Sequence, residues 1–120
     1  MEIVGTLNQE LVRYLDLNTR QIQLTASNMA NIDTPGYRAV GMDFEAEMRQ
    51  AMRSIDAGDA VHDPTVRKVD GLIVRPDGND VSMDRESLNL AEAQLRFKTG
   101  VALLKGQFSG IMSAIHADAK

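Results

Sequence analysis

Apolar residues recur at three- and four-residue steps along the first part of the chain, a period that is typical of an amphipathic helix. We predict a helix from Leu7 to Asn31, within an N-terminal segment 1–32. Thr6 is the expected N-cap, because Gln9 three residues later completes a capping-box pattern. The apolar stripe of this helix consists of Leu7, Leu11, Tyr14, Leu15, Ile22, Ala26 and Met29.

The last part of the chain has near-heptad apolar spacing, which predicts a second long helix. We expect this helix to begin near Ser82 or Asp84 and to end at about Ala117, within a segment 81–120. A second stripe widens its apolar surface, so the helix needs more than one neighbour. The first stripe is Leu90, Ala93, Phe97, Val101, Leu104, Phe108, Ile111 and Ile115, and the second is Leu88, Ala91, Leu95 and Ala102.

A short third helix is predicted over residues 43–54. Asp43 can cap it, and Glu45 and Glu47 favour its positive N-terminal end. Its apolar face consists of Phe44, Met48, Ala51 and Met52.

Residues 55–80 change character, because glycines and prolines interrupt every helical window. Two alternatives stay open for this segment. It is an irregular loop that is disordered in solution, or it contains a short β-hairpin built from Val66, Val69 and residues 72–74.

The segment 33–42, between the first and the short helix, contains a strongly specified turn. A residue that precedes proline is pushed out of the helical region, and Pro-Gly favours a tight turn with positive φ at the glycine. The asparagine amides at the helix end can bond to backbone groups that the helix leaves unsatisfied. A plain helix stop would have the same local pattern. The residues concerned are Asn28, Asn31, Thr34, Pro35, Gly36 and Tyr37.

Composition narrows the functional classes. The chain of 120 residues is one domain by size, and its five aromatic residues (two tyrosines, three phenylalanines) favour helix–helix packing. A net charge of −4 gives no electrostatic reason to bind nucleic acid. Without cysteine there is no disulfide framework and no thiolate metal site.

The sequence shows neither a transmembrane segment nor a secretory signal peptide. No apolar run of about 18 residues is present, so no transmembrane helix is predicted. The N-terminus lacks the basic start, apolar stretch and cleavage site of a secretory signal peptide. These features alone predict a cytoplasmic protein.

The residue types of catalytic and metal sites do not form a credible set. The acidic cluster that begins at Asp77 fails the EF-hand pattern, because Ser82 and Leu88 occupy its sixth and twelfth positions. A turn at Asp77-Gly78 followed by helix-capping carboxylates is the preferred interpretation. His62 and His116 have no spaced partners, so we expect no enzyme activity, cofactor, metal or small-molecule substrate.

The turn resembles a known signature. The residues Ala30-Asn31-Ile32-Asp33-Thr34-Pro35-Gly36-Tyr37 closely resemble the A-N-x-x-T-P-G-[YF] core that follows a helix in bacterial flagellar rod and hook proteins. Two further stretches are similar to the proximal rod type. They are Asp43-Phe44, and residues 77–86 leading into Leu90-Ala91-Glu92-x-x-Leu95-Arg96-Phe97.

This resemblance implies a mainly α, elongated structural subunit of the proximal flagellar rod. The long terminal helices would pair antiparallel in a coiled-coil-like manner, with a short third helix and an irregular or short β middle segment. Copies would pack around an export channel and transmit torque. The family leaves the cell through the flagellar type III export apparatus without a cleaved signal and ends in the periplasmic rod, which overrules the cytoplasmic prediction.

The resemblance also implies partners. They are other copies of the chain, other proximal rod proteins, the adaptor FliE, the MS ring protein and the export gate. Phe44-x-x-x-Met48 resembles the motif by which rod and hook subunits dock on that gate. The alternative is that both side chains simply pack in the folded subunit, and both interpretations can hold at different stages.

Helix packing between chains is the expected role of the terminal helices. Each glycine inside a helix costs about 1 kcal/mol relative to alanine. The last helix nevertheless contains Gly100, Gly106 and Gly110. They either permit close backbone approach or lie in a helix that becomes ordered only on assembly, and we favour ordering on assembly. The alternative to a proximal rod subunit is a soluble helical adaptor or chaperone, or another rod component. The expected assembly residues are Leu7, Leu11, Tyr14, Ile22, Met29, Leu90, Phe97, Leu104, Phe108, Ile111, Ile115, Gly106 and Gly110.

Overall fold

A computed structural model describes residues 2–118 of the chain. The molecule is elongated, with extents of 70 × 27 × 16 Å, and mainly helical, which confirms the predicted fold class. In chain order its elements are α1 (Glu2–Ala30), β1 (Val40–Gly41), α2 (Phe44–Ala57), β2 (Arg67–Lys68) and α3 (Met83–Asp118).

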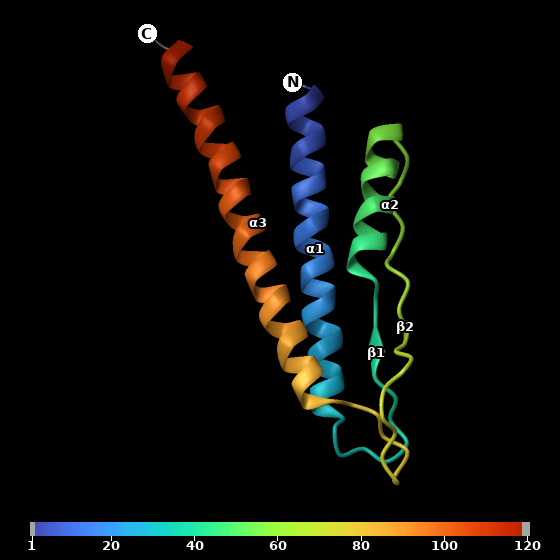
Figure 1. Cartoon of the computed structure of the whole chain (residues 1–120). Coiled ribbons are helices and arrows are strands. Elements are labelled where there is room, and N and C mark those ends of the chain that lie inside the picture. Colours follow the sequence, from blue (N-terminus) through green and yellow to red (C-terminus); the bar gives the residue numbers. More distant parts are fainter. Residues whose placement is uncertain (1, 119–120) are drawn as a thin grey trace.

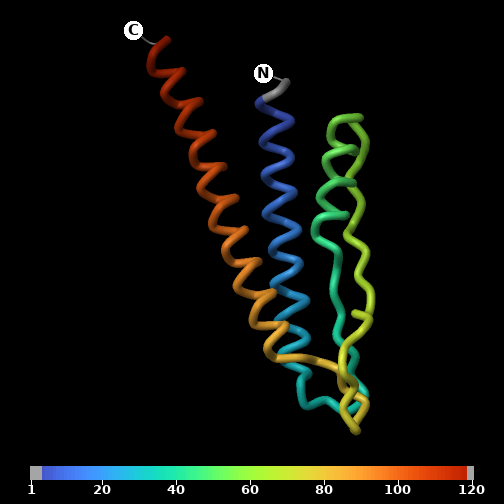
Figure 2. Tube along the Cα trace, viewed as in Figure 1, coloured from blue at the N-terminus to red at the C-terminus, as the bar shows by residue number. Residues whose placement is uncertain are grey.

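The two long helices, α1 and α3, run antiparallel and are joined at one end of the molecule (Figure 1). They lie close together near that end and diverge toward the two termini, as the Cα trace also makes clear (Figure 2). α2 lies on the other side of α1, so α1 is the central helix and contacts both others. At Gly100 the two long helices approach closely, because an added Cβ would lie 2.8 Å from Leu15 Cδ2.

The start of α1 differs from the prediction. The helix already includes Glu2, so Thr6 lies inside it and the predicted N-cap is wrong. Nothing in the residues before Thr6 stops a helix, and the apolar steps continue back to Val4. At the other end Asn31 N donates to Ser27 O at 3.2 Å, and the helix ends one residue before the prediction.

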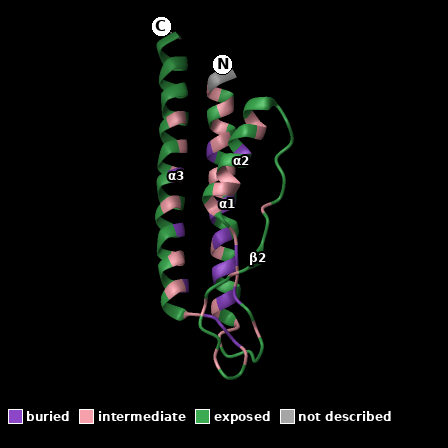
Figure 3. Cartoon of the chain, turned by 45° about the vertical axis from the view of Figure 1, so that its right-hand side comes forward, coloured by how far each residue is buried: buried purple, intermediate pink, exposed green. Residues whose placement is uncertain are grey.

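The buried face of α1 is wider and more polar than its apolar stripe suggests (Figure 3). Leu17 and Leu24 are buried although the predicted stripe omits them, whereas Ala26 is exposed although the stripe includes it. A helix between two neighbours buries a broad sector, so the single-stripe prediction was too narrow. Four polar residues are buried in the same sector: Asn18, Gln21, Thr25 and Asn28.

α2 begins as predicted, since the Asp43 side chain accepts a hydrogen bond from Ala46 N at 3.1 Å. The helix continues to Ala57, three residues beyond the predicted end. It stops where Gly58 adopts a left-handed conformation (φ 76°) and donates from its N–H to Ile55 O at 3.1 Å.

Of the two alternatives for residues 55–80, the hairpin built from Val66, Val69 and residues 72–74 does not form. β2 pairs instead with β1, antiparallel, with Val40 opposite Lys68 and Gly41 opposite Arg67. The strands lie on either side of α2 in the chain, and residues 72–74 are not a strand. The returning segment is held alongside the helices, because Thr65 N donates to Glu47 Oε1 (3.0 Å) and Arg13 donates to His62 O (2.6 Å).

α3 begins next to Ser82, whose Oγ accepts a hydrogen bond from Arg85 N at 3.3 Å, in agreement with the prediction. Its first half packs on α1, with Ala93 and Gly100 buried. Its second half is mostly exposed, including Phe108 at 66%. Within residues 2–118, no helix combines the length and apolarity that a membrane crossing requires.

Candidate functional site

The turn after α1 has the predicted geometry. Tyr37 N donates to Thr34 O at 3.2 Å, which closes a four-residue turn with proline second and glycine third. Gly36 has φ +75°, as a type II turn requires at its third position. A side chain at this position would be strained, which explains why glycine occupies it. Proline at the second position and glycine at the third position favour this turn type through local sterics alone.

Asn28 connects the turn to two other parts of the chain. It is buried on the last turns of α1, and its Nδ2 donates to Val40 O (2.8 Å) and to Glu86 Oε1 (3.0 Å). Its Oδ1 accepts from Val40 N (3.0 Å) and from Tyr37 Oη (3.1 Å). The amide therefore pairs with both backbone groups of Val40 as a neighbouring strand would, and it holds β1 against the helix.

Asn31 has a smaller, more local role. Its Nδ2 donates to Ser27 O at 2.8 Å. This carbonyl already accepts from Asn31 N at 3.2 Å, so the amide does not pair with a group that the helix leaves unsatisfied, which differs from the prediction. Its Oδ1 accepts from Thr34 Oγ1 at 3.1 Å.

A second turn, at residues 75–78, packs directly on the first. Gly78 N donates to Arg75 O at 2.8 Å, so the predicted Asp77-Gly78 turn forms, and Gly36 N donates to Asp77 O at 2.8 Å. A Cβ added at Gly78 would lie 3.3 Å from Gly36 Cα. The two glycine turns thus lie back to back. Gly78 has no room for a Cβ without a shift, whereas at Gly36 the space is open and only the positive φ disfavours a side chain.

Asn79 and Asp80 fix the first turn from the opposite side. Asn79, fully buried, donates from Nδ2 to Asn31 O (2.8 Å) and Thr34 O (2.9 Å). Asp80 accepts from Ala39 N at 2.6 Å. These side chains were predicted as part of a turn and helix caps, and their inward role was missed. Each bonds to residues more than 40 positions away, which no local pattern reveals.

Two arginines and a buried carboxylate complete this junction. Arg75 donates to Val81 O (2.7 Å) and to Ile32 O. Glu86, in the first turn of α3, is fully buried, and its Oε1 also accepts from Arg85 at 2.8 Å. Its Oε2 is buried without a partner among the described residues. We define the polar junction as Asn28, Asn31, Thr34, Tyr37, Arg75, Asn79, Asp80, Arg85 and Glu86.

Phe44 and Met48, the proposed export motif, are half-buried in the folded subunit. Phe44 packs edge-on against Tyr14, with ring centroids 5.5 Å apart and an angle of 82°. The Arg96 guanidinium lies over the same ring, 4.6 Å from its centroid. One aromatic side chain thereby links all three helices, and it is not freely available to a partner in this state.

The predicted assembly residues fall into three groups. Leu11 is buried between the helices. Tyr14, Ile22, Met29, Leu90 and Leu104 are half-buried, and Leu7, Phe97, Phe108, Ile111 and Ile115 are exposed. Gly106 and Gly110 make no close approach inside the subunit, since an added Cβ at either meets nothing within 4 Å.

The junction is built for rigidity. Its buried amides and carboxylates bond mainly to backbone groups of the turn and β1. Within residues 2–118, no group of histidine, aspartate and glutamate side chains is arranged to hold a metal ion. The arrangement therefore fixes the direction in which the chain leaves α1.

Comparisons with known proteins identify the family. No family model matches the chain. It is 31% identical to the flagellar basal body rod protein FlgB of Yersinia enterocolitica, over 84% of the chain and 87% of that protein. It is 31% identical to FlgB of Escherichia coli K12 (86% and 88%) and 34% identical to FlgB of Cereibacter sphaeroides ATCC 17029 (87% and 89%). The chain belongs to the FlgB family of flagellar basal body rod proteins.

Proposed function

We propose that the chain is a structural subunit of the proximal rod of the bacterial flagellum, part of the drive shaft that transmits torque and encloses the export channel. The observation that carries this proposal is the combination of a rigid polar junction with long helices whose far ends leave apolar side chains exposed. Membership of the FlgB family supports it.

The mechanism is mechanical. The polar junction fixes β1 relative to α1, because Asn28 on α1 bonds to both backbone groups of Val40 and Asp80 accepts a hydrogen bond from Ala39 N, all beyond the turn. Torque applied to one element then reaches the others through buried hydrogen bonds, with little bending at the turn. The exposed apolar side chains of α1 and α3 remain for burial against other subunits.

Gly106 and Gly110 fit the same role. They are one helical turn apart on α3, in open space, so a neighbouring backbone can approach closely at this strip. Within the subunit alone they are simply unfavourable for a helix.

The proposed partners are other copies of the chain, other proximal rod proteins, the adaptor FliE, the MS ring protein and the type III export gate. Phe44 and Met48 would engage the gate before the subunit folds, since Tyr14 and Arg96 cover Phe44 afterwards. Export without a cleaved signal peptide, followed by a location in the periplasmic part of the basal body, completes the proposal.

Gene deletion with complementation tests this function. We expect deleted cells to be non-motile, and the complementing chain, detected with an antibody raised against it, to co-purify with basal bodies on an immunoblot. Normal swimming of deleted cells, or a chain that is found only outside the basal-body fraction, would overturn the proposal and favour a soluble adaptor.

A further inference from the structure

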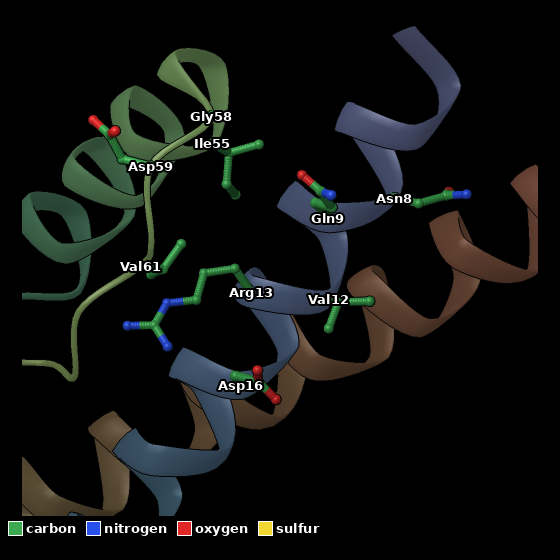
Figure 4. A pocket seen from close by; sticks show the side chains of 9 residues that line it. All are labelled: Asn8, Gln9, Val12, Arg13, Asp16, Ile55, Gly58, Asp59 and Val61. Atoms are coloured by element: carbon green, nitrogen blue, oxygen red, sulfur yellow. The ribbon is translucent and has the colours of Figure 1, made fainter. Parts of the chain in front are cut away.

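α1 and α2 bound an apolar groove near the end of α2. Two adjoining hollows share Ile55 and Gly58, and each is lined by residues of both helices. In the hollow of Figure 4, Arg13 and Ile55 extend into the space from opposite walls. We call the two hollows together the α1–α2 groove. Its apolar lining consists of Leu7, Val12, Ile55, Ala57 and Val61.

The rim of the α1–α2 groove is strongly acidic. Arg13 is the one cationic side chain among its lining residues, and that guanidinium already donates to His62 O at 2.6 Å. The last turn of α2 carries no basic residue, so the negative end of its helix dipole adds to the negative electrostatic potential of the groove. The carboxylates are Glu10, Asp16, Asp56 and Asp59.

The distal half of α3 has complementary chemistry. Between residues 93 and 117 the sequence contains no carboxylate, whereas Lys98 and Lys105 are both present. Lys105 lies three and seven residues before Phe108 and Met112, so all three share one helix face. Phe108 and Met112 are exposed there, in a helix that diverges from α1.

The distal half of α3 cannot fill the α1–α2 groove of its own chain. α3 packs on one side of α1 and α2 on the other, and α3 leans further from α2 toward its C-terminal end (Figure 1). The apolar, cationic helix and the apolar, acidic groove lie on opposite sides of one subunit. The helix of one copy can therefore fit the groove of another copy.

We propose that the distal half of α3 of one copy docks in the α1–α2 groove of the next copy, with Lys105 facing Glu10 and Asp56. This inference rests on the proposed assembly function and specifies which surfaces of two copies meet. The two surfaces differ, so the contact is heterologous and leaves a free surface at each end. Successive copies then add side by side in one direction.

Site-specific photo-cross-linking in cells tests the contact. Phe108→benzoylphenylalanine places the probe on the exposed face, and Met112→benzoylphenylalanine is the second variant if the first does not assemble. We expect a product of twice the subunit mass whose linked peptide comes from residues 6–16 or 55–61 of the other copy. Ile73→benzoylphenylalanine, 90% exposed and outside both surfaces, is the control and should give no such product.

Charge reversal gives a second readout. Lys105→Glu should lower the yield of cross-linked product about tenfold, and Asp56→Lys in the same chain should restore it. Arg49→Glu, exposed on α2 outside the groove, should leave it unchanged. Linkage of position 108 to a different protein, or to another region of the second copy, would overturn the docking. An immunoblot of the basal-body fraction from the same cells reports the proposed rod function separately.

Discussion

At the scale of single residues, Asn28 determines most about how the chain leaves α1. Its amide makes four hydrogen bonds, to Tyr37, to Glu86 and to both backbone groups of Val40. All of these partners lie beyond the end of α1. One buried side chain therefore connects the first helix, the turn, β1 and the start of α3.

Replacing this amide should be costly. Asn28→Ala leaves both backbone groups of Val40 without this partner and removes one of the two donors to the buried Glu86 carboxylate, so we expect the free energy of unfolding to fall by about 3 kcal/mol. Asn31→Ala is the matched control, because its bonds are local and exposed, and it should cost less than about 1 kcal/mol. Urea unfolding followed by circular dichroism measures both. Equal losses in the two variants would contradict the role assigned to Asn28.

The two open glycines of α3 should separate helix stability from assembly. Gly106→Ala and Gly110→Ala each favour the helix by about 1 kcal/mol, and nothing in the subunit obstructs the added Cβ. We expect greater helicity in the isolated chain and fewer rods per cell. Unimpaired or improved rod formation would remove the argument for close approach.

Some residue-level features were predictable and others were not. The turn follows from Thr34-Pro35-Gly36, because proline and glycine restrict the backbone through local sterics. The inward roles of Asn79 and Glu86 did not follow, since their partners are 48 and 58 residues away in the chain. A polar residue that is buried by tertiary structure carries no periodic signal of its own.

At the scale of elements, α1 is the helix on which the others pack. Leu17→Ala should lower the free energy of unfolding by about 3 kcal/mol, because this side chain is 1% exposed and its loss leaves a cavity. Val12→Ala, at a 49% exposed site of the same helix, should change it by less than about 0.5 kcal/mol. Thermal unfolding of both variants checks the burial pattern, and similar losses would mean that α1 packs through a different face.

The two halves of α3 should differ in stability. Its first half packs on α1 through Ala93 and Gly100, while its second half keeps large apolar side chains in water. We expect amide hydrogens of residues 103–118 in the isolated chain to exchange much faster than those of residues 86–96. Hydrogen exchange read by mass spectrometry measures this difference. Uniform slow exchange along α3 would contradict ordering on assembly.

Elements with a clear period were predictable. The terminal helices and the Asp43 cap followed from local patterns, as did the start of α3 near Ser82. The start of α1 did not, because a capping pattern at Thr6 also occurs inside helices. The pairing of β1 with β2 was missed as well, since each strand is two residues long and the partners are separated by α2.

At the scale of the whole molecule, the shape determines what remains for other chains. The long helices are joined at the polar junction and diverge at the opposite end, so the apolar side chains at their far ends cannot bury each other (Figure 1). Ordering of these ends when they are buried at the assembly site would keep free subunits from polymerising early. The rigid junction and the unpaired ends therefore serve the same assembly.

The central claim is that this chain builds the proximal rod. Electron cryotomography of cells that lack its gene tests the claim most directly. The account predicts basal bodies with membrane rings and no rod, and a rod that returns when the gene is restored. Complete basal bodies with a normal rod in the deleted cells would contradict it.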